Sequence, residues 1–240
     1  EQDRLVNKDI QSKGLHDYVT HVDKNSEMKL VAGLQKILPE AGFLVEENTI
    51  DNTGQEYTWI IDPLDGTTNF IHGLPVYSIS IALMHNKEVI QGVVYDVKAN
   101  ECFYAWQGSP AYLNGREIHV SDTAKLEESL LATGFPYSDF SRQEAYLKVF
   151  SRLMQSCRGI RRYGSAAIDL AWVACGRFDG FWEYSLKPWD VAAGSFIVKQ
   201  AGGSCSDLKG GSNFIYGQEI LCGNCHIYQQ LLKLTKTHFE

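Results

Sequence analysis

The sequence lacks any apolar run close to the roughly 18 to 20 residues that span a membrane. It also lacks an N-terminal signal-peptide pattern, so we expect a cytoplasmic location and no membrane partner. Basic residues are in deficit, because 22 Lys and Arg face 29 Asp and Glu for a formal net charge of −7 at pH 7. A nucleic-acid partner requires a clustered basic surface, and this charge argues against one.

Apart from one pair, the sequence also lacks closely spaced cysteines. Its six cysteines are scattered along the chain, which is typical of buried, reduced thiols. The one near pair lies in CGNCH, residues 222–226, which matches the C-x-x-C-H pattern of haem attachment. The other interpretation is a strand that ends at Cys222, a turn at Gly223 and Asn224, and a helix from Cys225. We favour it because five-residue patterns recur by chance. A Soret band would favour haem.

No repeat, low-complexity segment or Pro/Gly/Ser linker divides the 240 residues. A content of 44% hydrophobic and 21% charged residues is ordinary for a globular protein. We therefore expect two α+β halves, residues 1–120 and 121–240, in one continuous packed unit. The opening EQDRLVNKDI resembles the middle of an element, so we expect a first helix to be missing before Glu1.

Periodicity predicts the order of elements. Helical spacing predicts a helix over 26–38, and apolar runs that end in acids predict strands over 43–47 and 57–62. Alternation from 76 to 120, with Asn-Gly at 114–115, predicts an antiparallel meander. Further on, strands are expected at 129–135, 159–163, 178–183, 203–208 and 219–222, and helices at 142–154, 165–176, 190–203 and from 225.

The stretch WIIDPLDGTTNF, residues 59–70, concentrates polar groups after an apolar strand. Asp62 ends the strand and Pro63 fixes the next turn. Residues three apart in a strand point to opposite faces, so Asp62 and Asp65 converge only if the chain turns between them. The turn also exposes the Leu64 carbonyl. Two carboxylates and a carbonyl form a hard oxygen set that suits Mg²⁺ rather than zinc.

The residues that follow suit an anion. Gly66, Thr67 and Thr68 are predicted to open a helix, whose free N–H groups favour phosphate, and glycine permits close approach. One alternative is that Asp-Pro and Asp-Gly merely mark two turns. Another is the aspartyl-phosphate phosphatase pattern, but its acids are two residues apart, whereas these are three apart.

More acids would complete a two-metal site. Glu46 and Glu47 lie at another predicted strand end, and Asp190 lies at the start of a predicted helix. Taken singly, a Glu-Glu pair is typical of a solvated edge and the aspartate of a helix cap. Together with residues 62–67 they form a coherent set.

WIIDPLDGTTNF and WDVAAGSFIVKQAGG resemble the inositol monophosphatase family of Mg²⁺-dependent, lithium-sensitive phosphomonoesterases. KGLHDYVTHVD, VEEN, GVVYDV, YLNGREIHVS, RRYGSAAIDLAWVACGRFDGFWE and LKPWDVAAG follow in the family's order, so the resemblance covers nearly the whole chain. VEEN departs from the commoner Gly-Glu-Glu-Ser/Thr but keeps the acids. The resemblance implies an α+β fold, a layered α-β-α-β-α sandwich, as a homodimer with two or three Mg²⁺ ions and inhibition by Li⁺.

The resemblance also implies roles for individual residues. The expected metal ligands are Glu46, Asp62, the Leu64 carbonyl, Asp65 and Asp190. The expected catalytic residues are Glu46, Thr67 and Asp65, with Glu46 and Thr67 orienting the attacking water. The expected substrate contacts are the amides of Gly66 and Thr67 for phosphate, and Gly164, Ser165, Ala166 and Glu183 for hydroxyls. Lys13 and Asp17 match a mobile loop, and Asp23 matches a further acid.

The implied reaction is hydrolysis of inositol-1-phosphate by metal-activated water, without a covalent enzyme intermediate. Two metal ions in such sites activate the water and stabilise the leaving oxygen. The same chemistry on fructose-1,6-bisphosphate, NADP(H), histidinol phosphate or a nucleotide 3′-phosphate stays open. A regulatory binding protein that retains the fold is the alternative of a different class.

Overall fold

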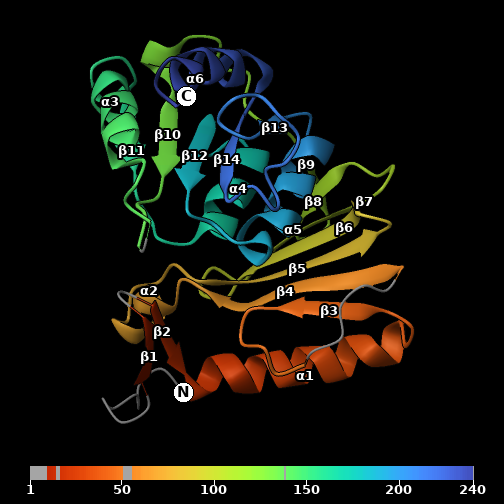
Figure 1. Cartoon of the computed structure of the whole chain (residues 1–240). Helices are drawn as coiled ribbons and strands as arrows, with labels where there is room; N and C mark the ends of the chain where they lie inside the picture. Colours follow the sequence, from red (N-terminus) through yellow and green to blue (C-terminus); the bar gives the residue numbers. More distant parts are fainter. Residues whose placement is uncertain (1–9, 15–16, 51–55, 138, 240) are drawn as a thin grey trace.

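The computed structural model describes residues 10–14, 17–50, 56–137 and 139–239. Helices and sheets alternate in five layers, with α1 on one outside and α3 and α6 on the other (Figure 1). The α+β class and the layered α-β-α-β-α sandwich are thereby confirmed. Within the described ranges, no helix combines the length and the apolar character needed to cross a membrane.

The first sheet is the predicted meander extended by two more strands. In spatial order its strands are β3 (Gly42–Val45), β4 (Tyr57–Asp65), β5 (Ser78–His85), β6 (Glu88–Asp96), β7 (Glu101–Trp106), β8 (Ala111–Leu113) and β9 (Arg116–Ile118). Only β3 and β4 pair in parallel. Helix α1 (His21–Ile37) packs on one face, where Val31 joins Phe43, Trp59 and Ile61 in an apolar cluster. Burial of these side chains fixes α1 against β4.

The middle layer consists of α4 (Ala166–Ala174) and α5 (Pro188–Gln200). Eight of the nine residues of α4 and the run from Val191 to Val198 in α5 are buried, because a sheet covers each side. Helix α5 lies close to β6, and a Cβ atom on Gly92 would stand 2.7 Å from the Ala193 carbonyl oxygen. Glycine therefore permits this close contact of helix and sheet.

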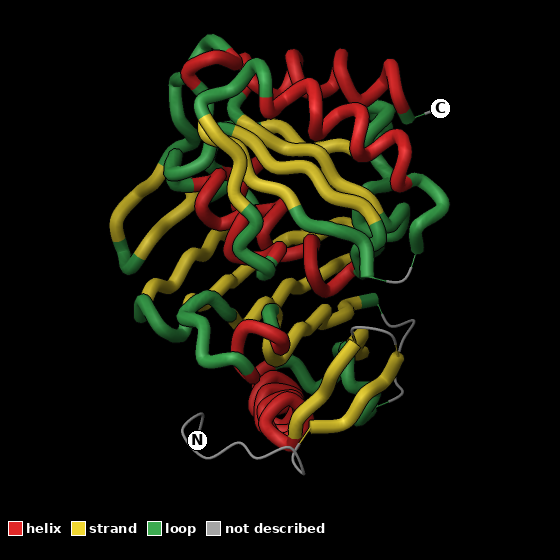
Figure 2. The backbone as a smooth tube through the Cα atoms, turned by 90° about the vertical axis from the view of Figure 1, so that its left-hand side faces the viewer, coloured by secondary structure: helices red, strands yellow, loops and turns green. Residues whose placement is uncertain are grey.

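The second sheet is mixed. Its strands in order are β11 (Gly159–Arg161), β10 (Leu130–Thr133), β12 (Gly180–Tyr184), β14 (Glu219–Gly223) and β13 (Ser204–Ser206). Strand β10 runs parallel to β11 and β12, whereas β14 is antiparallel to β12 and β13. Helices α3 (Gln143–Met154) and α6 (Cys225–His238) cover its outer face (Figure 2). Tyr146, Trp182 and Tyr184 fill the core between them.

Three short elements complete the fold: α2 (Thr67–Ile71), the 3₁₀ turn η3 (Leu126–Glu128) and the hairpin of β1 (Ile10–Gly14) and β2 (Asp17–Thr20). The hairpin lies beside α1 and α2 (Figure 1). The segment that carries Lys13 and Asp17, which matches the family's mobile loop, has a backbone that pairs as antiparallel strands. Mobility of this segment stays a prediction, and Glu1 lies outside the described residues.

Several element boundaries differ from the prediction. Strand β4 runs on to Asp65 instead of turning after Asp62, and α5 begins at Pro188 because proline suits a first helical turn.

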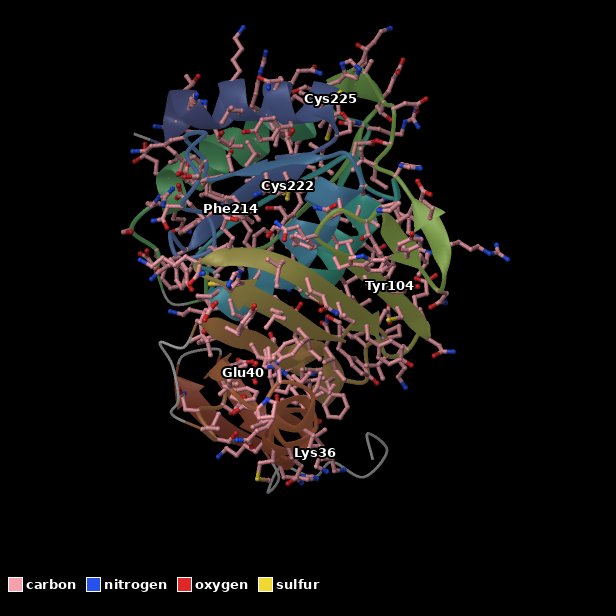
Figure 3. All side chains as sticks on the ribbon, turned by 90° about the vertical axis from the view of Figure 1, so that its right-hand side faces the viewer. Lys36, Glu40, Tyr104, Phe214, Cys222 and Cys225 are labelled. Atoms are coloured by element: carbon pink, nitrogen blue, oxygen red, sulfur yellow. The ribbon has the colours of Figure 1, made fainter. Side chains whose placement is uncertain are left out.

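The region of CGNCH follows the strand–turn–helix interpretation. Cys222 is buried in β14 and Cys225 is exposed at the start of α6 (Figure 3), which argues against haem attachment. The division at residue 120 stays a prediction.

Candidate active site

The two aspartates of β4 meet on one face because the strand is bulged between them. Asp62 pairs with Ser80 of β5, and Asp65 pairs with Ser78. An interval of three residues on β4 therefore lies opposite an interval of two residues on β5. Paired residues project to the same face, and residues two apart on β5 share a face. The predicted convergence of Asp62 and Asp65 is present, but a bulge around Pro63 produces it rather than a turn at the strand end.

Hydrogen bonds within the motif orient its oxygen atoms. The Leu64 N–H donates to Asp62 Oδ1 at 2.9 Å. The Thr67 hydroxyl lies 3.1 Å from both the Leu64 carbonyl oxygen and Asp23 Oδ1. Asp23, in the first turn of α1, is buried. Because these two acceptors compete for the hydroxyl proton, the lone pairs of Thr67 face outward from them as acceptors.

Gly66 brings the motif against the loop before α4. Its φ is +96°, and a Cβ atom there would stand 3.0 Å from the Val76 carbonyl oxygen and 3.2 Å from that of Gly164. Asn69 ties the same two segments together, because its Nδ2 donates to the carbonyls of Val76 at 2.7 Å and Tyr163 at 2.6 Å. Glycine at 66 is required by both conformation and space.

Asp65 is held by the N-terminus of α4. Its Oδ2 accepts hydrogen bonds from the Ser165 hydroxyl at 2.6 Å and from the Ala167 N–H at 2.8 Å. Ser165 is also the N-cap, accepting from the Ile168 N–H. Burial raises the pKa of Asp65, while Ser165 and the N–H groups of Ala167 and Ala166 lower it in part. Contact of Ser165 or Ala166 with a substrate stays a prediction.

Asp190 reaches the site from α5. It is the third residue of the helix, and its Oδ2 accepts from the Lys187 N–H at 2.7 Å. The sequence assigned it to the helix start, which is correct to within one turn. Burial holds the pKa of Asp190 well above its usual range, and the negative charge of Asp65 adds to the rise.

Together the acids concentrate negative charge, which Arg162 and the N–H groups around Asp65 offset only in part. Burial is the main cause that holds the pKa of Asp62 well above its usual range, and Glu46, Asp65 and Asp190 raise it further. Asp62, Asp65 and Asp190 each use one carboxylate oxygen for the hydrogen bonds above, and the second oxygen takes no part in them. Buried carboxylates that repel one another, next to a carbonyl, are a donor set that fits a hard divalent cation.

The fit does not rest on a closed cage of side chains. Across residues 10–14, 17–50, 56–137 and 139–239, no three His, Cys, Asp or Glu side chains are gathered tightly enough to form one. Mg²⁺ seldom uses such a cage, since it keeps several waters and binds one or two carboxylates with substrate oxygens. The Leu64 carbonyl, water and phosphate oxygens would supply the remaining ligands.

Glu27 is a residue of the site region that the sequence analysis missed. It is fully buried, its Oε2 accepts from the Glu47 N–H at 2.7 Å, and its Oε1 accepts from the Thr49 N–H and hydroxyl. Glu27 thereby fixes the loop after β3 that carries Glu46. The available signal was its spacing of four from Asp23, which places both acids on one face of α1.

A second group of charges lies between β12 and α4. Glu183 is 6% exposed, and burial raises its pKa to about 8 although Arg162 opposes the rise. Asp169 on α4 was also missed: its Oδ1 is buried without a hydrogen-bond partner, and burial holds its pKa well above its usual range. Arg162 lies over the rings of Phe135 and Tyr137 and bonds to the Tyr137 hydroxyl.

Lys13 and Asp17 are placed on β1 and β2, whose hairpin lies beside α1 and α2, and their roles stay predictions. A groove of about 540 Å³ between α3 and α6, lined by Leu147, Arg152 and Leu234 among others, contains none of the predicted site residues.

Comparisons with known proteins find relatives along nearly the whole chain. An "Inositol-1-monophosphatase" of Mesorhizobium japonicum is 38% identical over 233 residues, covering 97% of this chain and 88% of that protein. A "Nus factor SuhB" of Escherichia coli K12 is 42% identical over 221 residues, covering 92% and 83%. The structure of a Thermotoga maritima IMPase matches with a TM-score of 0.86 and 39% identity, over 95% of this chain and 87% of that one.

A suhB protein of Bartonella henselae matches with a TM-score of 0.89 and 40% identity, over 95% of this chain and 88% of that one. The model of the inositol monophosphatase family matches residues 1–240. A match over the whole sequence, together with relatives of about 40% identity, supports phosphatase chemistry. The chain belongs to the inositol monophosphatase family.

Proposed function

We propose that the protein is a Mg²⁺-dependent phosphomonoester hydrolase that converts inositol-1-phosphate to inositol and phosphate by direct attack of water. The observation that carries this proposal is the convergence of Asp62 and Asp65 on one face of β4, with Asp190 close enough for its charge to raise the pKa of Asp62. Relatives at 38% and 41% identity are named inositol-1-monophosphatase.

The residues that would hold the metal are Glu46, Asp62, Asp65, Asp190 and the Leu64 carbonyl oxygen. When bound, Mg²⁺ supplies positive charge that lowers the pKa of a bound water and stabilises charge on phosphate and on the leaving oxygen. The hydrogen bonds of Asp65 with Ser165 and Ala167 preset the direction of its carboxylate. This presetting reduces the reorganisation needed on binding.

Thr67 and Glu46 orient the attacking water in this proposal. The Thr67 hydroxyl donates toward Asp23 or Leu64, so its oxygen accepts a hydrogen bond from water. Glu46 supplies a carboxylate on the loop that Glu27 holds. The first N–H groups of α2 have no partner within the helix and would bind phosphoryl oxygens, as Gly66 and Thr67 were expected to do.

Glu183 would select the alcohol part of the substrate. A carboxylate that accepts hydrogen bonds from substrate hydroxyls discriminates strongly, because an unmatched buried polar group is costly. Homodimer formation and inhibition by Li⁺ are proposed on the family resemblance alone, and a cytoplasmic location on the missing signal-peptide pattern. The net charge of −7 does not support direct binding of nucleic acid.

A second candidate function is the binding of a macromolecular partner. The observation that favours it is that relatives at 42% identity are named Nus factor SuhB. A protein that binds a macromolecular partner through this fold would not need turnover. Asp65→Asn separates the two functions. Partner capture that persists in this variant while phosphate release is lost would show two independent functions.

The test of the substrate is phosphate release from a panel of monoesters at saturating Mg²⁺. The panel contains inositol-1-phosphate, fructose-1,6-bisphosphate, NADP⁺, histidinol phosphate and a nucleoside 3′-phosphate. The highest kcat/KM for inositol-1-phosphate is expected. A higher value for another ester would keep the reaction and replace the substrate, and no release from any ester would favour the binding protein.

A further inference from the structure

The carboxylate of Glu183 rests against the backbone of Gly134. A Cβ atom built on Gly134 would stand 1.9 to 2.1 Å from the carboxylate carbon and oxygens of Glu183, far inside any allowed contact. Gly134 follows β10, whose last residue Thr133 pairs with Trp182 beside Glu183 on β12. Any side chain at 134 would therefore occupy the place where the Glu183 carboxylate lies.

Conformation does not explain glycine at this position. Gly134 is not among the glycines with positive φ, such as Gly66 and Gly164. An L-residue could adopt its backbone without the strain of the left-handed region. The distinguishing property of Gly134 is thus the space it leaves.

The Glu183 carboxylate is buried and unpaired in this space. Among the described residues it accepts no hydrogen bond, and it is 6% exposed. Arg162 is the positive charge that acts on it, and Arg162 is itself bonded to Tyr137. Asp169, a buried acid on α4 whose Oδ1 has no hydrogen-bond partner among the described residues, lies close enough for Glu183 to raise its pKa. A buried carboxylate in this state gains most from a ligand that donates hydrogen bonds.

We propose that Gly134 is a positioning residue for substrate recognition, because the missing side chain leaves the space from which the Glu183 carboxylate meets a hydroxyl-bearing substrate. The inference rests on the proposed function and adds to it the residue that makes the Glu183 contact possible. Gly134 touches neither phosphate nor metal ligands in this account. Its effect is therefore confined to esters whose alcohol part carries hydroxyl groups.

The test compares Gly134→Ala, Glu183→Ala and the double variant on two substrates. Inositol-1-phosphate offers hydroxyls to Glu183, whereas p-nitrophenyl phosphate offers none. Gly134→Ala is expected to lower kcat/KM for the inositol ester about tenfold, mainly through KM, the scale of one lost hydrogen bond. The value for the aryl ester should stay within about twofold. Gly33→Ala is the matched control, since its Cβ meets nothing within 4 Å.

The double variant tests the link between the two residues. With the carboxylate removed, the methyl group at 134 has room, so the double variant should match Glu183→Ala alone. Losses that multiply, or equal losses on both esters, would overturn the inference. If Gly134→Ala does not fold, Glu183→Asp withdraws the carboxylate without adding an atom, and the same split between the two esters is expected.

A crystal structure of Gly134→Ala provides a readout independent of activity. Displacement of the Glu183 carboxylate is expected, and an unmoved carboxylate would overturn the inference. If the wild-type protein hydrolyses neither ester, the proposed function fails and the inference falls with it. If it hydrolyses both and Gly134→Ala affects them equally, only the inference fails.

Discussion

Ser165 donates a hydrogen bond of 2.6 Å to Asp65, one hundred residues earlier in the chain. The bond joins the bulged strand of the first sheet to the N-terminus of α4 in the middle layer. Each residue depends on the other, because the donor caps a helix and the acceptor is a buried acid with a raised pKa. The site is therefore assembled by tertiary contacts rather than by one motif.

Removal of this hydrogen bond should reduce both stability and activity. Ser165→Ala loses the cap of α4 and a donor to Asp65, so a loss of about 1 to 2 kcal/mol in free energy of unfolding is expected. Phosphate release should fall at least tenfold. Asn224→Ala removes the N-cap of α6, away from the acids, and serves as the control. Equal activity of the two variants would contradict the positioning of Asp65 by Ser165.

Asp190→Asn should abolish turnover while the fold is kept. The amide oxygen can still accept from the Lys187 N–H, so α5 should begin as before. Loss of one carboxylate removes a proposed metal ligand and also a charge that raises the pKa of Asp62. Circular dichroism and phosphate release measure the two effects. Near-normal release by a folded variant would exclude Asp190 from the metal site.

Catalysis should require the hydroxyl group of Thr67 rather than the shape of its side chain. Thr67→Val keeps the volume but loses the hydrogen bonds to Asp23 and the Leu64 carbonyl. A fall in kcat of roughly 10² to 10⁴ is expected if the hydroxyl orients the water. Thr67→Ser retains the hydroxyl and should retain most activity. Similar kcat values for the Val and Ser variants would show that the hydroxyl has no such role.

Mg²⁺ should stabilise the protein by binding only the folded state. At about 100 times its Kd, a ligand adds about 2.7 kcal/mol, or roughly 5 to 10 °C in Tm for a chain of this size. Asp62→Asn should remove most of that shift. Asp96→Asn, which replaces a buried aspartate of β6, is the control and should keep it. A shift that is unchanged in Asp62→Asn would place the cation elsewhere.

Glu183 should make metal-free protein less stable as pH rises. Its pKa of about 8 in the fold exceeds the reference value of 4.5, so the folded state retains a proton that the unfolded state releases between these values. The free energy of unfolding then falls with pH in that window, by up to about 1.4 kcal/mol per unit. Below pH 4.5 both states are protonated, and the effect is absent.

Glu183→Gln removes this proton linkage. Its stability relative to wild type in EDTA should therefore rise from about pH 5 to pH 8, measured by urea denaturation. Glu101→Gln is a control of opposite sign, because hydrogen bonds from Arg177 lower the pKa of Glu101 and its stabilisation is lost only as acid protonates it. A constant difference between wild type and Glu183→Gln across this range would contradict the burial of the carboxylate.

The acids of the site could be predicted from the sequence, whereas the strand bulge and tertiary contacts that bring them together could not. Asp62, Asp65 and Asp190 could be proposed because acids after apolar strands and before helices are visible in one dimension. The bulge in β4 could not, because Asp-Pro and Asp-Gly indicate turns locally, whereas pairing of Asp65 with Ser78 depends on β5. Tertiary pairing overrode local turn preference.

The residues that the sequence analysis missed are those whose surroundings come from distant parts of the chain. Glu27 appears as one more polar residue of a surface helix until the loop after β3 places N–H groups against it. Gly134 appears as a turn residue until Glu183 is seen against it. Asp169 lies in an otherwise apolar helix, and that buried position was the signal that could have identified it.

Metal dependence of phosphate release tests the central claim most directly. Inositol-1-phosphate is incubated with the protein in Mg²⁺, in EDTA, and in Mg²⁺ with added Li⁺, and released phosphate is measured. Release that requires Mg²⁺, stops in EDTA and is inhibited by Li⁺ is the predicted result. Undiminished release in EDTA, or none in any condition with Mg²⁺ demonstrably bound, would contradict the account.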